Sequence, residues 1–175
     1  MYQALEQALI RIFGTPELMM NAVSWHRDIN SGYRKTVSGI EASSRDERLW
    51  HDGLWQSRLR QGMTPEWHDV LTIRYGDDYS KRIMAWQRIQ LRFSRDERLP
   101  EPIRSNPVLI RLWLMYELQH PQLRSRKGQF DITGKSERTV YRWKKICRRV
   151  CSEWITLAED EAQALLEQAG SIRYE

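Results

Sequence analysis

Apolar side chains recur at steps of three and four residues along nearly the whole chain, the spacing that places them on one face of an α-helix. The stretch 2–13 carries Leu5, Leu9 and Ile12 in this way, and Gly14 follows as a stop. Alternation of apolar and polar residues, which is typical of strands, is weak everywhere. The pattern predicts an all-α fold built as a multi-helix bundle.

Prolines, glycines and capping residues divide this pattern into separate helices. Thr64-Pro65-Glu66, like the similar triplet at 15–17, places a capping side chain just before a proline in the first helical turn. Further helices are expected over 18–29, 44–61, 64–75, 77–93 and 108–119. The side chains expected to anchor three of them in the core are Leu49, Trp50, Leu54 and Leu59, then Ile83, Trp86, Ile89 and Phe93, then Leu109, Leu112, Trp113 and Tyr116.

Positive charge is concentrated in one short stretch. The chain carries +5 overall with a pI of about 9.4. Residues 122–150 hold ten Lys or Arg against two acids, whereas residues 151–175 hold six acids against one Arg. A basic segment followed by an acidic one indicates an anionic partner for the first of them.

The basic segment also contains signals for a turn and a helix start. Gly134 can adopt the left-handed backbone of a tight turn, and Ser136 is a natural N-cap for a following helix. Steps of three and four then predict one buried stripe. Its members are Val140, Trp143, Cys147, Val150, Trp154 and Leu157.

Basic side chains recur at the same steps on the opposite side of this predicted helix, at Arg138, Arg142, Lys145 and Arg149. A DNA major groove admits such a helix, whose first turns contact bases while later Lys and Arg contact phosphates. The alternative is an amphipathic helix whose basic face touches only water. The expected DNA-binding residues are Lys135, Ser136, Glu137, Arg138, Thr139, Arg142, Lys144, Lys145, Arg148 and Arg149, with Arg124, Arg126 and Lys127 before them.

The sequence Gly-x-Ser-x-Arg-Thr-Val-Tyr-Arg-Trp over 134–143 resembles the turn and recognition helix of helix-turn-helix regulators. The resemblance implies a supporting helix around 126–133. Gly128 is a poor helix former there, and Lys135 stands where an apolar turn residue is usual. The supporting helix is therefore short or irregular, or the helix expected over 108–119 takes its place.

A second resemblance covers 64–76, Thr-Pro-Glu-Trp-His-Asp-Val-Leu-Thr-Ile-Arg-Tyr-Gly, which is similar to the opening helix of sigma-factor region 4. The smaller phage antitermination Q proteins carry a similar helix. This resemblance implies binding near a promoter and contact with bacterial RNA polymerase. The alternative is that 64–76 is a plain core helix.

Two His-Asp pairs, His51-Asp52 and His68-Asp69, suggest a metal-dependent hydrolase, but no third histidine lies near either pair. The chain contains no phosphate-binding loop, dinucleotide fingerprint or nucleophile elbow. The sequence therefore predicts a protein that is not an enzyme and that uses no cofactor or metal.

Cys147 and Cys151 lie four apart in a helical pattern, which suits neither a disulfide framework nor a zinc knuckle. We interpret them as free thiols of a cytoplasmic protein, acting inside a bacterial host cell. No apolar run approaches the length of about 20 residues that a membrane span needs, so no membrane partner is expected.

Three prolines over 100–107 predict a linker, and the chain divides around it. Residues 1–99 are expected to form a Trp-rich helical body, 108–157 a helix-turn-helix region that binds double-stranded DNA, and 158–175 an acidic final helix or tail. The predicted function is a sequence-specific transcription regulator, in its sharpest form a phage-type late-gene antiterminator. The alternatives are a DNA-packaging oligomer similar to a small terminase, or a helical protein-interaction module.

Overall fold

Seven α-helices make up 86% of the residues that the computed structural model describes, which are 5–14, 45–119 and 135–168, and no strand lies among these residues. The predicted all-α class is confirmed. The helices are α1 (Leu5–Gly14), α3 (Arg45–Gly62), α4 (Pro65–Tyr75), α5 (Tyr79–Ser94), α6 (Glu101–Arg104), α7 (Pro107–Leu118) and α8 (Glu137–Gln168). The helix predicted over 18–29 lies outside the described residues. Within the described part, no helix combines the length and apolar character needed to cross a membrane.

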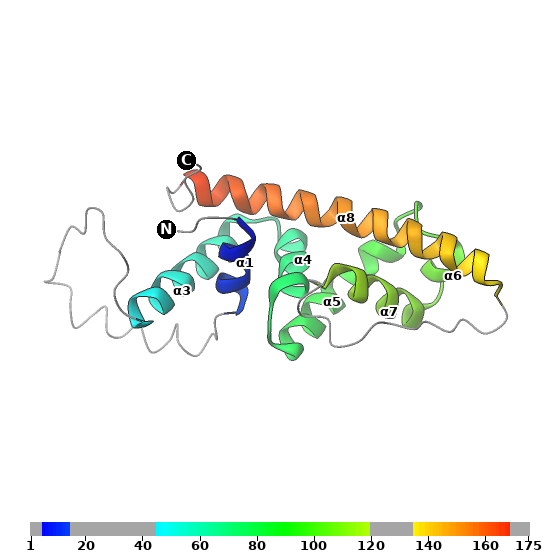
Figure 1. Ribbon diagram of the computed structural model, residues 1–175, viewed down its shortest axis with the longest axis horizontal. Coiled ribbons are helices and arrows are strands. Elements are labelled where there is room, and N and C mark those ends of the chain that lie inside the picture. Colours follow the sequence, from blue (N-terminus) through cyan, green and yellow to red (C-terminus); the bar gives the residue numbers. More distant parts are fainter. Residues whose placement is uncertain (1–4, 15–44, 120–134, 169–175) are drawn as a thin grey trace, which may run out of the picture.

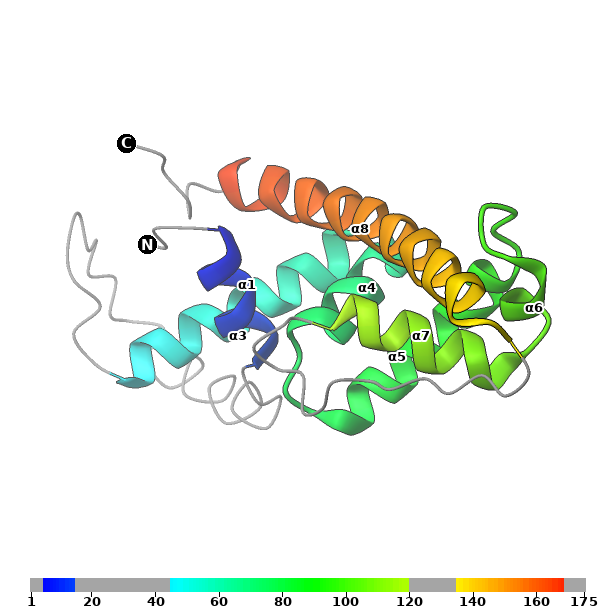
Figure 2. The ribbon, with the colours of Figure 1, turned by 45° about the vertical axis from the view of Figure 1, so that its right-hand side comes forward.

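Helix α8 is the longest of the described helices and packs against three others, and we refer to it as the spine. It has 32 residues, a length of about 48 Å at 1.5 Å per residue. Both views show it along one long edge, with α3 below its C-terminal part and α7 below its N-terminal part (Figures 1 and 2). It contacts α3, α4 and α7, while α1 packs on α3 and α4, and α5 packs on α4 and α7.

Helix α4 is enclosed on every side. Residues 69–73 are all buried, as is Tyr75, and five consecutive residues cover the full circumference of a helix. Its neighbours are α1, α3, α5, α7 and α8. The burial supports the interpretation of 64–76 as a core helix.

Aromatic rings join α4, α5 and α8 in the middle of the core. The rings of Phe93 and Trp154 are stacked, and the Trp67 ring meets Trp154 edge-on with centroids 5.2 Å apart. Trp86 also stacks with Phe93, with ring centroids 6.1 Å apart. The stack joins helices distant in sequence, which is how a Trp-rich chain anchors a small core.

Polar residues set the helix starts, although not always as predicted. Asp78 caps α5 by accepting hydrogen bonds from the backbone amides of Ser80 and Lys81. Thr64 was expected to cap α4, but it makes no side-chain cap bond. Instead, the amide and hydroxyl of Thr64 both donate to Oε1 of Glu161 on α8, each at 3.0 Å, so this residue ties α4 to the spine.

The stretch predicted as a linker, 100–107, contains α6 and packs into the core. Ile103 is fully buried, and α6 contacts α5 and α7. Asn106 then accepts hydrogen bonds from the amides of Val108 and Leu109, which starts α7 directly after Pro107. Pro100 and Pro107 stand at the starts of α6 and α7, and Pro102 lies in the first turn of α6, so this stretch joins packed helices.

Three predicted anchors are wrong because the helices are rotated slightly from the expected faces. Trp50 is 40% exposed, Leu112 49% and Leu157 51%. On α8 the buried stripe passes through Cys151, Ile155, Ala158, Ala162 and Leu166 instead. Cys151 and Ala162 lie eleven residues apart, as do Ile155 and Leu166. Eleven residues in three turns is closer to the period of a straight helix than the seven residues in two turns that lead from Val150 to Leu157. The helix also continues through the predicted boundary at 157–158 without a break.

Candidate nucleic-acid interface

The first turn of α8 is capped as predicted by Ser136. Its hydroxyl accepts a hydrogen bond from the amide of Thr139 at 3.3 Å, and its carbonyl accepts from the amides of Thr139 and Val140 at 2.9 and 3.1 Å. The two hydroxyls of Ser136 and Thr139 are themselves 2.9 Å apart. The cap fixes where the helix begins and so fixes the direction of the side chains that follow.

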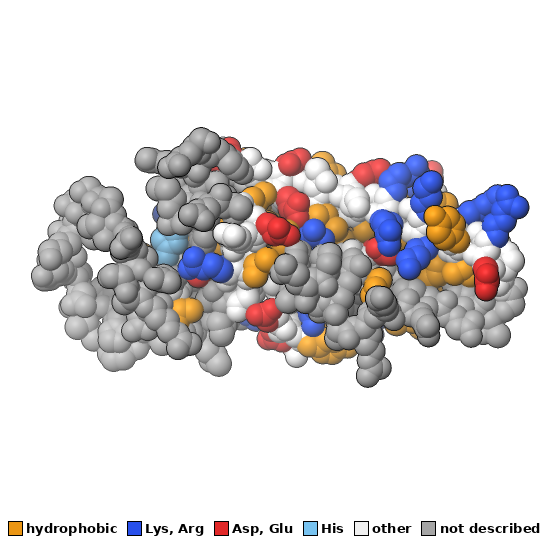
Figure 3. Space-filling view, in the orientation of Figure 1, with side chains coloured by type: hydrophobic (Ala, Val, Ile, Leu, Met, Phe, Trp, Pro, Cys, Tyr) orange, Lys and Arg blue, Asp and Glu red, His pale blue; other side chains and the backbone are white. Residues whose placement is uncertain are grey.

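Four basic side chains lie exposed on one face of the N-terminal part of α8, namely Arg138, Arg142, Lys145 and Arg149. We refer to these four as the basic face. Its Cα atoms span about 17 Å along the helix axis. Tyr141 is 71% exposed beside them, and Lys135 is exposed just before the helix. The space-filling view shows basic side chains gathered over this end of the molecule (Figure 3).

The placement of these charges is unfavourable for the helix itself. The N-terminus of a helix carries a partial positive charge, so Arg138 in the first turn is repelled by about 0.3–1 kcal/mol, and the four cations also repel one another. Glu137 is the one acid in the first turn. Packing does not need the basic residues, because the buried stripe lies on the opposite side. An anion bound there would be attracted by both the side chains and the helix terminus.

Two of the residues predicted to contact phosphates are placed differently from the basic face. Arg148 forms an ion pair with Glu117 of α7, with Nε 3.3 Å from Oε2. The Glu117 side chain is 5% exposed, so Arg148 compensates a buried carboxylate and fastens α7 to α8. Lys144 is half-buried. The helical spacing already set these two apart from the basic face, but it could not reveal the partner of Arg148, because Glu117 on α7 is distant along the chain.

The inner side of the same helical segment is fully packed. Cys147 and Cys151 are buried and free, as predicted. The Cys151 thiol lies 4.0 Å from the carbonyl oxygen of Leu114. Burial, assisted by the nearby Glu117 carboxylate, raises the pKa of Cys147 to about 12. Both thiols therefore serve as small apolar contacts between α7 and α8.

The solvent side of α8 becomes acidic after the basic face. Glu153, Asp160 and Glu167 are exposed further along the helix, and Figure 3 shows acidic side chains along that part of the edge. No Lys or Arg occurs between 150 and 168. A polyanion lying against α8 would be attracted over the first turns only and repelled beyond them.

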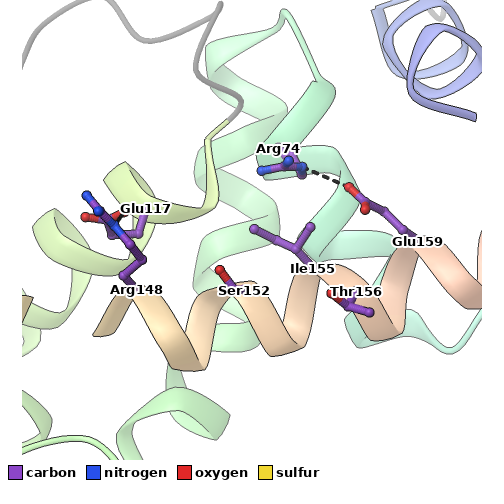
Figure 4. A pocket seen from close by; sticks show the side chains of 7 residues that line it. All are labelled: Arg74, Glu117, Arg148, Ser152, Ile155, Thr156 and Glu159. Carbon is purple, nitrogen blue, oxygen red and sulfur yellow. Dashed lines mark hydrogen bonds and ion pairs between the residues drawn. The ribbon is translucent and has the colours of Figure 1, made fainter. Parts of the chain in front are cut away.

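A groove of about 340 Å³ opens between α4, α7 and α8 (Figure 4). Its charged side chains are already paired across it. Arg74 donates from Nε to Oε1 of Glu159 at 3.0 Å, and the Arg148–Glu117 pair lies at the other end. The Tyr75 hydroxyl also donates to Glu159 at 2.6 Å. The groove therefore presents no net charge to a nucleic acid, and these contacts hold the helices together.

The His-Asp pairs are part of the packing between helices. Asp52 accepts both bonds from one guanidinium nitrogen of Arg11, at 2.9 and 3.1 Å, and His51 Nε2 accepts from the Trp55 indole at 3.1 Å. Asp69 is held by the guanidinium of Arg88. Among the described residues, no group of three His, Cys, Asp or Glu side chains is close enough to hold a metal ion.

The first half of the predicted helix-turn-helix lies outside the described residues. This concerns Gly134, the supporting helix expected around 126–133, and the basic residues Arg124, Arg126 and Lys127. Helix α7, the alternative supporting helix, does pack against α8. Residues 119–136 separate the two helices, however, whereas a helix-turn-helix joins its pair by three or four residues.

Comparisons of this chain with protein-family models, with curated proteins and with solved structures found no match.

Proposed function

We propose that this protein binds double-stranded DNA through the basic face of α8 and acts as a sequence-specific transcription regulator. The observation that supports this most is the exposure of Arg138, Arg142, Lys145 and Arg149 on one side of a capped, well-packed helix. A surface helix needs only scattered charges for solubility. Four exposed cations on one face, the first of them in the opening turn where it opposes the helix dipole, favour an anionic partner.

The residues divide into two roles by their place on the helix. Arg138 and Arg142 lie in the first turns, where a recognition helix meets base edges, and an arginine can bond the O6 and N7 of guanine together. Lys145 and Arg149 lie one to two turns later and would contact phosphates. Thr139 was expected to contact bases, but its hydroxyl is engaged by Ser136. Exposed Tyr141 is the better candidate for an apolar contact to a base.

The sharper form of the proposal, a phage-type antiterminator that engages bacterial RNA polymerase, rests on the resemblance of 64–76 alone. Because α4 is enclosed, only its outer residues such as Glu66 and Trp67 keep part of their surface accessible. Recovery of polymerase subunits from a nuclease-treated bacterial lysate on the immobilised protein would support this form. Recovery that disappears with nuclease would show that DNA alone links the two.

Selection from a random duplex library, followed by fluorescence anisotropy over a salt series, tests the DNA-binding proposal. Phosphate contacts by Lys145 and Arg149 give a slope of log affinity against log salt of about −2, and any further phosphate contact makes the slope steeper. We expect Lys145→Gln with Arg149→Gln to weaken binding to all sequences and to reduce that slope by about 2. Arg138→Gln or Arg142→Gln should relax preference at a base position by about 1–3 kcal/mol.

Arg60→Gln serves as the control, since Arg60 is exposed on α3 and lies outside the basic face. It removes one positive charge and should leave the salt slope unchanged. Selection that returns no preferred site would contradict sequence specificity. Affinity that is equally insensitive to all of these variants would contradict the basic face as the DNA contact.

A further inference from the structure

One line of exposed side chains along α8 carries an ordered pattern of charge. We refer to it as the α8 ridge, and its members are Arg138, Arg142, Lys145, Arg149, Ser152, Glu153, Thr156, Asp160 and Glu167. Other exposed residues of α8 flank this line, namely Glu137, Tyr141, Arg148, Leu157, Ala164 and Gln168. Cations occupy the first part of the ridge, Ser152, Glu153 and Thr156 the centre, and acids the last part. Helix α8, which carries the ridge, lies along a long edge of the molecule in both ribbon views (Figures 1 and 2).

Two of the four cations of the ridge are complementary to its last two acids in register as well as in sign. The point midway between Ser152 and Glu153 is equally distant from Arg138 and Glu167, about 22 Å along the axis in each direction. It is also equally distant from Lys145 and Asp160, about 11 Å each way. If a second α8 runs antiparallel across this point, these two cations of one copy face the two acids of the other, and each pair occurs twice.

The centre of the ridge can accommodate such a crossing. Ser152 and Thr156 are small, so two helices can approach closely there. Glu153 is the one centre residue that would meet its own copy with like charge. Its carboxylate is held by the guanidinium of Arg98, which also pairs with Asp96, so the repulsion is reduced.

We propose that two copies of this chain associate through their α8 ridges, antiparallel about a two-fold axis between Ser152 and Glu153. The occupant of the acidic half is the basic half of a second copy, because the charges match at corresponding distances from one point. An unrelated basic partner would need no such match. This association goes beyond DNA binding, and it uses the same basic face, so a second copy and DNA compete.

The strength of the association follows from its chemistry. Exposed ion pairs each contribute little and are screened by salt, and little apolar surface lies on the ridge. The dimer is therefore weak, forms at high protein concentration, and dissociates as ionic strength rises.

Sedimentation velocity at low and high salt, on the full chain, tests the proposal with two charge reversals. Lys145→Glu puts two acids opposite each other in a homodimer, and Asp160→Lys puts two lysines there. Each variant alone should raise the dimer dissociation constant on the order of tenfold. An equimolar mixture should restore a one-to-one dimer, because the carboxylate introduced in one variant then faces the ammonium introduced in the other. The two positions are about 22 Å apart on one helix, so no contact within a chain explains the recovery.

Glu97→Lys is the matched control, since Glu97 is exposed and lies outside the ridge; it should dimerise like the original chain. Circular dichroism checks that every variant stays helical. A chain that stays monomeric at low salt and high concentration would overturn the proposal. So would a dimer that the single reversals do not weaken, or a mixture that does not recover.

The two proposals fail separately. Asp160→Lys leaves the basic face intact, so it should weaken self-association while retaining DNA affinity. Recovery of the mixed dimer without any DNA binding by the original chain would keep the ridge and reject the function. DNA binding by a strictly monomeric chain would support the proposed function and reject association through the ridge.

Discussion

The rings of Phe93 and Trp154 stack at a centroid distance of 3.9 Å, with their planes inclined by 24°. The contact fastens α5 to the middle of α8, between the basic face and the acidic end of the helix. The guanidinium of Arg92 lies 5.4 Å from the ring centroids of both Trp67 and Trp154, which adds a cation–π contact at the edge of the stack.

Trp154→Ala should lower the free energy of unfolding by about 3–5 kcal/mol, because it leaves a cavity bounded by rings that cannot collapse onto it. Urea denaturation followed by circular dichroism measures this. Trp50→Ala is the control, since Trp50 is 40% exposed, and should cost about 1 kcal/mol or less. Equal losses in the two variants would show that the stack is not the centre of the core.

The ion pair between Asp69 and Arg88 should respond asymmetrically to substitution. The Asp69 side chain is 5% exposed and the Arg88 side chain 55%, and Nε of Arg88 donates to Oδ2 at 2.8 Å. Arg88→Met strands a buried carboxylate and should cost about 2–3 kcal/mol. Asp69→Asn frees a guanidinium that reaches water and should cost about 1 kcal/mol. A larger loss for Asp69→Asn in urea titrations would contradict this account.

Gly76→Ala should destabilise the fold by about 1–3 kcal/mol, because a Cβ there would lie 2.5 Å from the backbone oxygen of Thr72 and the chain itself must move. Gly62→Ala is the matched comparison. Its Cβ would meet only the tip of the Leu165 side chain, at 3.2 Å, and alanine favours the helix there. We expect a change within about 1 kcal/mol for Gly62→Ala by thermal unfolding. A similar loss at both sites would be inconsistent with the backbone clash.

The free energy of unfolding should fall as pH drops below about 6.5. Burial holds the pKa of His68 below its ordinary value of 6.5, and burial does the same for His51. A lowered histidine pKa means that the unfolded chain binds more protons, so acid favours unfolding, by at most about 1.4 kcal/mol per pH unit for each histidine. His68→Gln should reduce this dependence when urea midpoints near neutral pH and at about pH 5 are compared. An unchanged pH dependence would assign the loss of stability in acid to other titrating groups.

Local signals in the sequence were sufficient to predict most helices. The spacing of Leu9 and Ile12, and the proline after Thr64, predicted α1 and α4 to within a few residues. The predictions that failed depended on how the helices pack against one another. Leu157 was expected in the core, but it is 51% exposed. The adjacent Ala158 is fully buried instead, because Ala158 is the residue that faces the packed side of α8. Helix α6 was missed because prolines are also tolerated in first helical turns.

The candidate site was predicted only in part, because local signals reveal contacts between residues close in sequence and miss those between distant residues. The cap at Ser136 and the exposure of Arg142 follow from residues close in sequence, and the structure contains both. The pairing of Arg148 with Glu117 joins residues 31 apart, and no local pattern carries that information. DNA contact by the basic face stays a prediction.

The spine is the last described helix to leave the ribosome. Thr64 and Glu161, which α4 and α8 bring together, lie 97 residues apart, and Tyr75 and Glu159 lie 84 apart. While α1 to α7 are being synthesised, α4 lacks the surface that closes its core side. The contacts between α4 and α8 therefore form only after translation has passed α8, and until then the apolar surface of α4 that α8 covers is open to other partners.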